Sequence, residues 1–185
     1  MRDILIRSAS YTAILIGIIP VFGLILNYII ENIAKVLYRT VGIRLADFIL
    51  NRLTFLGTVH HELSHALFAV ITGAKVTKID LFHPSGCVLG KVSMYTRGNA
   101  IIKSIQLTMS AIAPMICGSI TLYIIYSYLS VNKVVGWKLA VIIYVMTSIF
   151  LHMTMSTQDI KNAIKGLPVC SLIIFVIISA IQFLK

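Results

Sequence analysis

Acidic residues and cysteine are scarce in this 185-residue chain, and each shortage excludes a class of protein. Only 6 residues are Asp or Glu against 16 Lys or Arg, and 12% of residues are charged, where a soluble domain has about 25%. Cys87, Cys117 and Cys170 are far apart and make no Cys-x-x-Cys pair, which argues against a cysteine metal site or a disulfide framework. The basic residues lie between apolar runs, so they are expected to anchor the chain at a lipid bilayer and not to bind nucleic acid.

Long apolar runs dominate the sequence instead, since 58% of the residues are hydrophobic. We therefore predict an α-helical polytopic membrane protein, with one membrane-embedded domain over residues 1–185 and about five transmembrane helices. The apolar runs cover residues 8–30, 53–72, 105–129, 137–155 and 167–184. The first run is long for a signal peptide and lacks a small-residue cleavage site, so we expect it to be retained. Residues 31–52 mix basic and apolar side chains, as in an amphipathic helix at a membrane interface.

Residues 75–95 break the helical pattern. They partly alternate and are rich in β-branched side chains, Pro84-Ser85-Gly86 favours a turn, and Gly73 is expected to end the helix before them. These features predict a short β-hairpin. Five spans would place the N-terminus, the hairpin and residues 156–166 on one side of the membrane. A slight excess of Lys and Arg on that side favours the cytoplasm.

The motif His61-Glu62-Leu63-Ser64-His65 lies inside the second apolar run. Residues four apart share a face of a helix, so His61 and His65 can hold one metal ion. Glu62 is rotated by about 100° from His61, which places it beside the ion without making it a ligand. Two histidines with an open coordination position are typical of catalytic zinc. The alternative is a coincidental polar patch, but ionisable groups in a membrane span are costly without partners.

A third metal ligand has few candidates, because Glu31 and Glu62 are the only glutamates and none follows the motif. The extended motif with a further Gly and His is also absent after His65. The remaining candidates are Asp80, His83, His152 and Asp159. The first two fall in the expected hairpin, and an ordinary packed histidine is the alternative for His152. Asp159 should reach the same membrane face as the motif, with a loop acid or a helix cap as its alternative role.

The motif and its surroundings resemble the site-2 protease family of intramembrane zinc metalloproteases, in particular its compact bacterial branch. The resemblance covers about residues 53–166, taken as the catalytic core. It rests on residues 61–67, on Gly73 with the 75–79 segment, and on Ser110-Ala111-Ile112-Ala113-Pro114, which is similar to the family's Ala-Gly-Pro stretch. Residues 156–159 resemble the acidic motif of the compact branch. Ala113 replaces the usual Gly, and Asp159 precedes Ile160 where the family has Asp-Gly.

This resemblance implies a multi-pass protease, expected in a bacterial cell membrane, that cleaves a transmembrane or juxtamembrane segment of a membrane-protein substrate. It implies a Zn²⁺ ion held by His61, His65 and Asp159, with Glu62 as the general base. A catalytically inactive relative that serves as a membrane scaffold or binding protein is the alternative, although an intact Glu62 argues against it. A transporter is disfavoured because the sequence has no inverted repeat.

A transmembrane substrate must unwind before cleavage, because a helix hides its backbone carbonyls in hydrogen bonds. An edge of the hairpin could hold the unwound segment by strand addition. Substrate contacts are therefore expected at Ile79 and Val92, and also at Pro114 in the third span. Pro114 and Gly118 would loosen that span beside the site, with simple close helix packing as the alternative.

Overall fold

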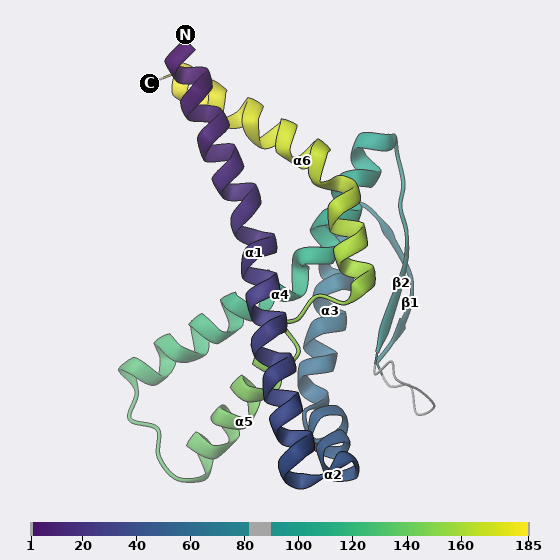
Figure 1. Cartoon of the computed structure of the whole chain (residues 1–185), viewed down its shortest axis with the longest axis vertical. Coiled ribbons are helices and arrows are strands. Elements are labelled where there is room, and N and C mark those ends of the chain that lie inside the picture. The colour runs from purple at the N-terminus through teal and green to yellow at the C-terminus, as the bar shows by residue number, and fades with distance from the viewer. Residues whose placement is uncertain (1, 82–89, 185) are drawn as a thin grey trace.

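The computed structural model of the protein describes residues 2–81 and 90–184, which are mostly helical (Figure 1). Its first half contains α1 (Arg2–Val41), α2 (Ile43–Asp47), the π-helical segment η1 (Phe48–Leu53) and α3 (Phe55–Ile71). Strands β1 (Lys75–Asp80) and β2 (Lys91–Tyr95) follow, and then α4 (Ala100–Val131), α5 (Trp137–Leu151) and α6 (Thr157–Phe183). This order confirms the predicted helical architecture with a hairpin after the motif helix.

Three of the described helices, α1, α4 and α6, are long and apolar enough to cross a membrane. Helix α5 is a shorter apolar helix, and α3 carries the second apolar run of the sequence. Five helices thus take up the five predicted runs. Many large apolar side chains on these helices are exposed, as expected where lipid is the surrounding solvent.

The first helix is longer than the sequence suggested. Residues 31–41 do not begin a separate interfacial helix, because α1 continues through them to Val41. Glu31 and Lys35 form an ion pair of 3.8 Å at helical spacing there, which supports the continuation. The chain leaves the helix only at Gly42, whose φ of 80° is a conformation that glycine adopts without strain.

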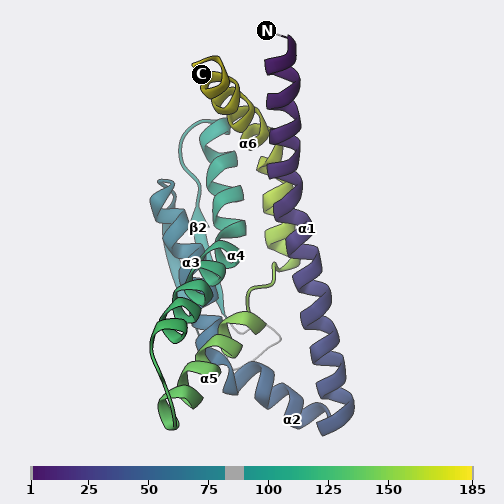
Figure 2. The same ribbon diagram turned by 90° about the vertical axis from the view of Figure 1, so that its left-hand side faces the viewer.

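Helices α5 and α6 follow one path through the molecule. Helix α5 has 15 residues, so it is about 22 Å long and shorter than the apolar thickness of a bilayer, about 30 Å. The chain leaves it at His152 and re-enters a helix at Thr157. Helix α6 then runs to the end of the molecule where α1 begins (Figures 1 and 2). Residues 156–166, expected to connect two spans, are therefore mainly the first turns of α6.

The two ends of the chain consequently lie together. The Ser8 hydroxyl donates a hydrogen bond of 3.3 Å to Gln182 Oε1, and both termini appear at one end of the molecule in two views (Figures 1 and 2). Five full crossings would have put the termini on opposite sides. The arrangement agrees instead with a last pair of helices that together make one passage.

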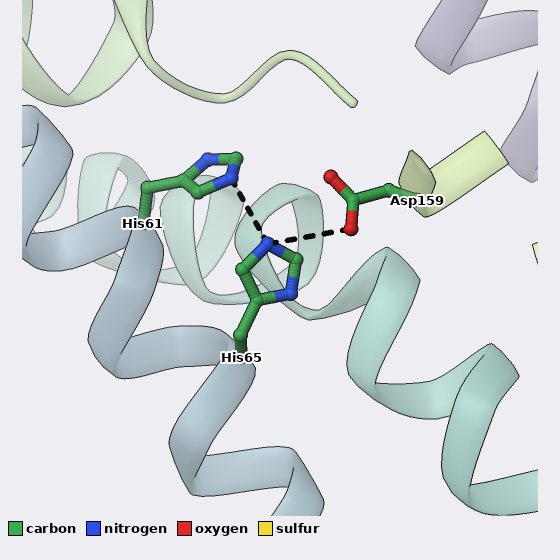
Figure 3. A group of neighbouring side chains, drawn as sticks. All are labelled: His61, His65 and Asp159. Atoms are coloured by element: carbon green, nitrogen blue, oxygen red, sulfur yellow. Dashed lines mark hydrogen bonds and ion pairs between the residues drawn. The ribbon is translucent and has the colours of Figure 1, made fainter. Parts of the chain in front are cut away.

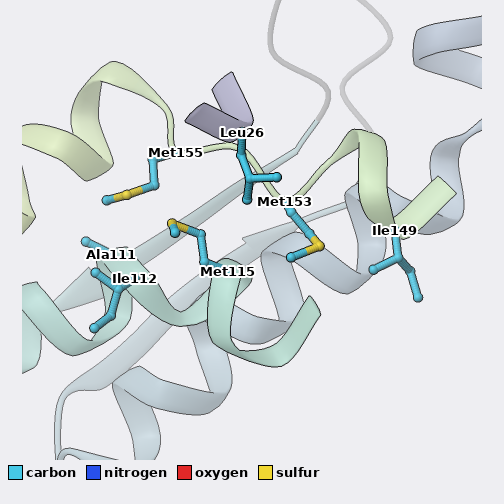
Figure 4. Close-up of a cluster of buried hydrophobic side chains, with 7 residues drawn as sticks. All are labelled: Leu26, Ala111, Ile112, Met115, Ile149, Met153 and Met155. Atoms are coloured by element: carbon cyan, nitrogen blue, oxygen red, sulfur yellow. The ribbon is translucent and has the colours of Figure 1, made fainter. Parts of the chain in front are cut away.

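The buried apolar core is small and rich in methionine, and it surrounds the break between α5 and α6 (Figure 4). It contains Leu26, Ala111, Ile112, Met115, Ile149, Met153 and Met155. Unbranched methionine side chains fill irregular space well, which suits a place where a helix is interrupted. The core therefore packs directly against the segment that leads to Asp159.

The hairpin is a two-stranded antiparallel sheet beside α3. Ile79 is paired with Val92 and Lys78 with Ser93, and the register shifts between Val76 and Lys78. Gly73, with φ of 84°, follows the end of α3 as predicted. The predicted turn at residues 84–86 lies outside the described residues.

Candidate metal and catalytic site

The two histidines of the α3 motif direct the same ring nitrogen at each other (Figure 3). Their Nε2 atoms are 3.0 Å apart. His61 Nδ1 lies 2.6 Å from the His152 carbonyl oxygen, and His65 Nδ1 lies 2.7 Å from the Ser110 carbonyl oxygen. A carbonyl oxygen can only accept, so each Nδ1 carries a proton that it donates. Each ring then directs Nε2, the nitrogen left to bind a cation, at the other ring.

Two lone pairs at this separation repel unless a proton or a metal cation lies between them. Asp159 Oδ1 lies 3.6 Å from His65 Nε2 and brings a carboxylate to the same point (Figure 3). Ligand atoms of the three residues all lie within 4.8 Å of one another. Zinc–ligand bonds of about 2.05 Å in a tetrahedral site would separate ligand atoms by about 3.4 Å. The residues present therefore fit zinc in donor type and in spacing.

Helix α6 begins with Asp159 in its first turn, and this placement fixes the carboxylate. Asp159 Oδ2 accepts hydrogen bonds from Ser156 N at 2.9 Å and from Ser156 Oγ at 2.6 Å, while Ser156 Oγ accepts from Asp159 N at 3.1 Å. This is a reciprocal capping box with Asp in the position more often held by Glu. The spacing Ser-x-x-Asp is visible in the sequence and could have identified the role of Ser156. One oxygen serves the cap and the other faces His65.

Glu62 lies next to the histidines and is 8% exposed. The backbone of Val92 donates a hydrogen bond to its carboxylate, so the first half of β2 holds this side chain. Gly90, just before β2, lets the backbone of the hairpin lie close to Glu62, because a Cβ there would be 2.6 Å from Glu62 Cγ. Sequence reasoning did not single out Gly90. Glu62 is thus held between α3 and the hairpin without joining the three-residue cluster.

A cavity of about 590 Å³ opens in front of this cluster. It is lined by residues of α3, the start and outer edge of β2, α4 and the first turns of α6: His61, Glu62, His65, Gly90, Lys91, Val92, Met94, Ser110, Ala111, Ser156, Thr157, Gln158, Asp159 and Asn162. Many of these side chains are polar. The cavity therefore gives the cluster a partly polar opening among apolar helices.

The other candidate ligands lie elsewhere. The His152 ring directs Nδ1 at the Ser148 carbonyl oxygen at 2.9 Å, so His152 serves the site through its backbone carbonyl. Asp80 pairs with Lys78 Nζ at 2.7 Å on the hairpin. His60, which precedes the motif and was not among the candidates, places Nε2 3.1 Å from Thr121 Oγ1. His83 lies outside the described residues.

The expected substrate contacts are distributed unevenly. Val92 lines the cavity, whereas Ile79 is on β1, is 42% exposed and does not line it. Pro114 is fully buried inside α4, which runs through it as one helix, and it does not line the cavity either. Pro114 therefore packs closely against its neighbours and does not face the cavity.

Helices α3 and α5 pack tightly against each other, and this contact positions the His152 carbonyl that binds His61 Nδ1. The Ser148 hydroxyl accepts a hydrogen bond of 2.7 Å from Gly57 N and donates one of 2.8 Å to the Thr54 carbonyl oxygen. A Cβ on Gly57 would overlap the Ser148 carbonyl oxygen and the His152 ring. A glycine is needed here because the two helices approach so closely. Nothing in the sequence pattern indicates this contact, because it joins residues far apart in the chain.

Comparison with known proteins identifies the family of the chain. A family model described as Peptidase M50B-like matches residues 29–184, which is most of the chain and includes every residue of the cluster. No curated protein and no solved structure matches the chain. The matched region and the long apolar helices confirm the resemblance drawn from the sequence. The chain is a membrane protein and belongs to the Peptidase M50B-like family of site-2 proteases.

Proposed function

We propose that this protein is a zinc metalloendopeptidase that cleaves a transmembrane or juxtamembrane segment of a membrane-protein substrate. The observation that carries the proposal is the meeting of His61 Nε2, His65 Nε2 and a carboxylate oxygen of Asp159 beside Glu62. Both rings are oriented by backbone carbonyls that fix the ring nitrogen facing the site. Such partners are typical of metal-binding histidines.

Glu62 is the general base in this proposal. Zinc, when bound, supplies a Lewis acid that polarises the scissile carbonyl and makes water a better nucleophile near neutral pH. The Glu62 carboxylate takes a proton from the attacking water and then delivers it to the leaving amine. The Val92 N–H and the absence of a side chain at Gly90 keep the carboxylate at the cavity wall.

In this proposal the cavity and strand β2 form the substrate-binding site. The polar walls provided by β2 and the first turns of α6 suit a peptide that has lost its helical hydrogen bonds. Val92 and Met94 both line the cavity, and alternate residues of a strand direct their backbone groups to the same side. The outer edge of β2 would therefore pair with an unwound substrate by strand addition.

The path of the helices supports a multi-pass arrangement with the site inside the bilayer. Helices α1, α3 and α4 would each cross, and α5 and α6 would cross together. Irregular backbone is tolerated at membrane depth only where it is buried in protein or lines a water-filled cavity. The segment between α5 and α6 meets both conditions, since Met153 and Met155 are buried and Ser156 lines the cavity.

Glu62→Gln tests the proposal. This change keeps the size of the side chain but removes its basicity, so cleavage of a transmembrane peptide should fall about 10²- to 10⁴-fold. Zinc content and thermal stability should stay as in the wild type. Glu31→Gln is the matched control, because Glu31 is the only other glutamate and is exposed on α1. Wild-type turnover by the Glu62 variant would refute the general-base role, and zinc binding without any wild-type cleavage would favour a scaffold.

A further inference from the structure

The α1 side chain of Asn27 forms two hydrogen bonds with one residue of the interruption between α5 and α6. Asn27 Nδ2 donates to the Met155 carbonyl oxygen at 3.2 Å, and Met155 N donates to Asn27 Oδ1 at 3.2 Å. The amide thus satisfies both backbone groups of Met155, which is buried and not helical. Leaving such groups unpaired inside a membrane is costly, because no water is there to replace the lost hydrogen bonds.

The peptide unit that Asn27 binds is the one that holds the Asp159 carboxylate. The carbonyl of Met155 and the N–H of Ser156 belong to the same planar peptide group. Its oxygen accepts from Asn27 Nδ2, and its N–H donates to Asp159 Oδ2 at 2.9 Å. Rotation of this plane would move the N–H away from the carboxylate. A chain of two hydrogen bonds therefore connects α1 to the acid beside His65.

Helix α1 is buried in two places, and one of them surrounds Asn27. Of its 40 residues, the buried ones are Ser8, Thr12, Gly23 and Leu26, and the last two lie within one turn of Asn27. A Cβ on Gly23 would lie 3.4 Å from Met155 Sδ and 3.2 Å from Met115 Sδ. The middle of α1 thus contacts the methionine core just where it binds the interruption.

We infer that Asn27 is a positioning residue for the third metal ligand: it fixes the Met155–Ser156 peptide, and this peptide fixes Asp159. The inference rests on the proposed zinc site. Asn27 lies before residues 29–184, so it is outside the region that matches the family. Helix α1 would then be a part of the metal site and not only a membrane anchor.

The test is a double-mutant cycle on zinc affinity, measured by chelator competition on purified full-length protein. Asn27→Leu keeps approximate volume and removes both hydrogen bonds. It should lower zinc affinity about 10-fold in the wild-type background, in the range seen when a partner of a ligand is lost. It should have no effect in the Asp159→Ala background, because there the peptide no longer holds a ligand. Asn32→Leu is the matched control, since Asn32 bonds only to Tyr28 O of its own helix among the described contacts.

A second variant separates the two hydrogen bonds and serves if Asn27→Leu does not fold. Asn27→Asp keeps an oxygen for Met155 N–H but offers no donor to the Met155 carbonyl. It should lower zinc affinity as much as Asn27→Leu does. The inference would be overturned, without affecting the proposed zinc site, by either of two results. One is an equal loss of zinc affinity in the wild-type and Asp159→Ala backgrounds, and the other is no loss of zinc affinity in a folded Asn27 variant. Wild-type protein without zinc affinity would overturn the site and the inference together, whereas active Glu62→Gln would overturn only the catalytic proposal.

Discussion

His65 Nε2 and Asp159 Oδ1 lie 3.6 Å apart, although one residue comes from the middle of α3 and the other from the first turn of α6 (Figure 3). Their meeting depends on the interruption that follows α5. A continuous helix through residues 152–156 would carry Asp159 farther along the bundle. The broken passage is therefore what turns a two-histidine motif into a three-ligand cluster.

Asp159→Ala should lower zinc affinity more than about 100-fold, beyond the 10- to 100-fold loss typical of a partner that only orients a ligand. His152→Ala should leave zinc affinity nearly unchanged and lower thermal stability, because the carbonyl that binds His61 belongs to the backbone and survives the substitution. Chelator competition and thermal unfolding on both variants measure these effects. If His152→Ala were the variant that lost zinc, the third ligand would have to be reassigned.

Ser156→Ala should affect both stability and metal binding. Loss of a helix N-cap costs about 0.5–2 kcal/mol, and here the cap also bonds Asp159 Oδ2. We expect zinc affinity to fall about 10-fold. Asn99→Ala is the matched control, since Asn99 caps α4 by accepting from Ile102 N at 3.0 Å but lies away from the cavity-lining residues. Equal zinc affinity in the two variants would show that Ser156 caps the helix and does no more.

The sequence predicted the local features of this molecule well. The spacing of His61 and His65 alone indicated a metal pair, because a helix puts such residues on one face. Partial alternation and Gly73 indicated the hairpin and the end of α3. The residues left Asp159 among four candidates for the third ligand, the resemblance favoured it, and the structure places it beside His65. Each of these inferences used a short stretch of the chain.

The features that the sequence could not predict are contacts between distant segments. Residues 137–155 read as one span because they are apolar throughout, but the helix ends at Leu151, where Asn27 and the methionine core can hold the chain in another conformation. Gly57 and Ser148 likewise meet only after α3 and α5 pack. Helical periodicity carries no information on such pairs, so the sequence indicated the helices themselves but not the interruption between the last two.

Gly90→Ala should impair catalysis without removing the metal. A Cβ at residue 90 would lie 3.2 Å from Glu62 Oε1 and closer still to Glu62 Cγ, so the carboxylate must shift. A displacement of about 1 Å in a catalytic group can cost about 100-fold in rate, and we expect a fall of 10- to 100-fold in kcat. Gly17→Ala in α1 is the control, because a Cβ there meets nothing within 4 Å. Unchanged kcat in Gly90→Ala would mean that Glu62 has room to move without loss.

The two strands of the hairpin allow a matched test of strand addition. Ile79 and Val92 are directly paired, and Val92 gives its N–H to Glu62 on the side away from β1. Both members of an antiparallel pair direct their backbone groups either at each other or outward. The N–H of Ile79 therefore also points outward, but from the far edge of β1, which does not line the cavity.

Proline at the cavity edge should therefore weaken substrate binding, while proline at the far edge should not. Met94 lies two residues after Val92 on the same edge, so Met94→Pro removes a donor that an added strand would use. One lost backbone hydrogen bond of about 0.5–1.5 kcal/mol would raise KM about 2- to 10-fold. Val92→Pro should also lower kcat, because it takes the N–H from Glu62. Ile79→Pro should change neither constant, and folded variants that all cleave with wild-type KM would show that the helices hold the substrate instead.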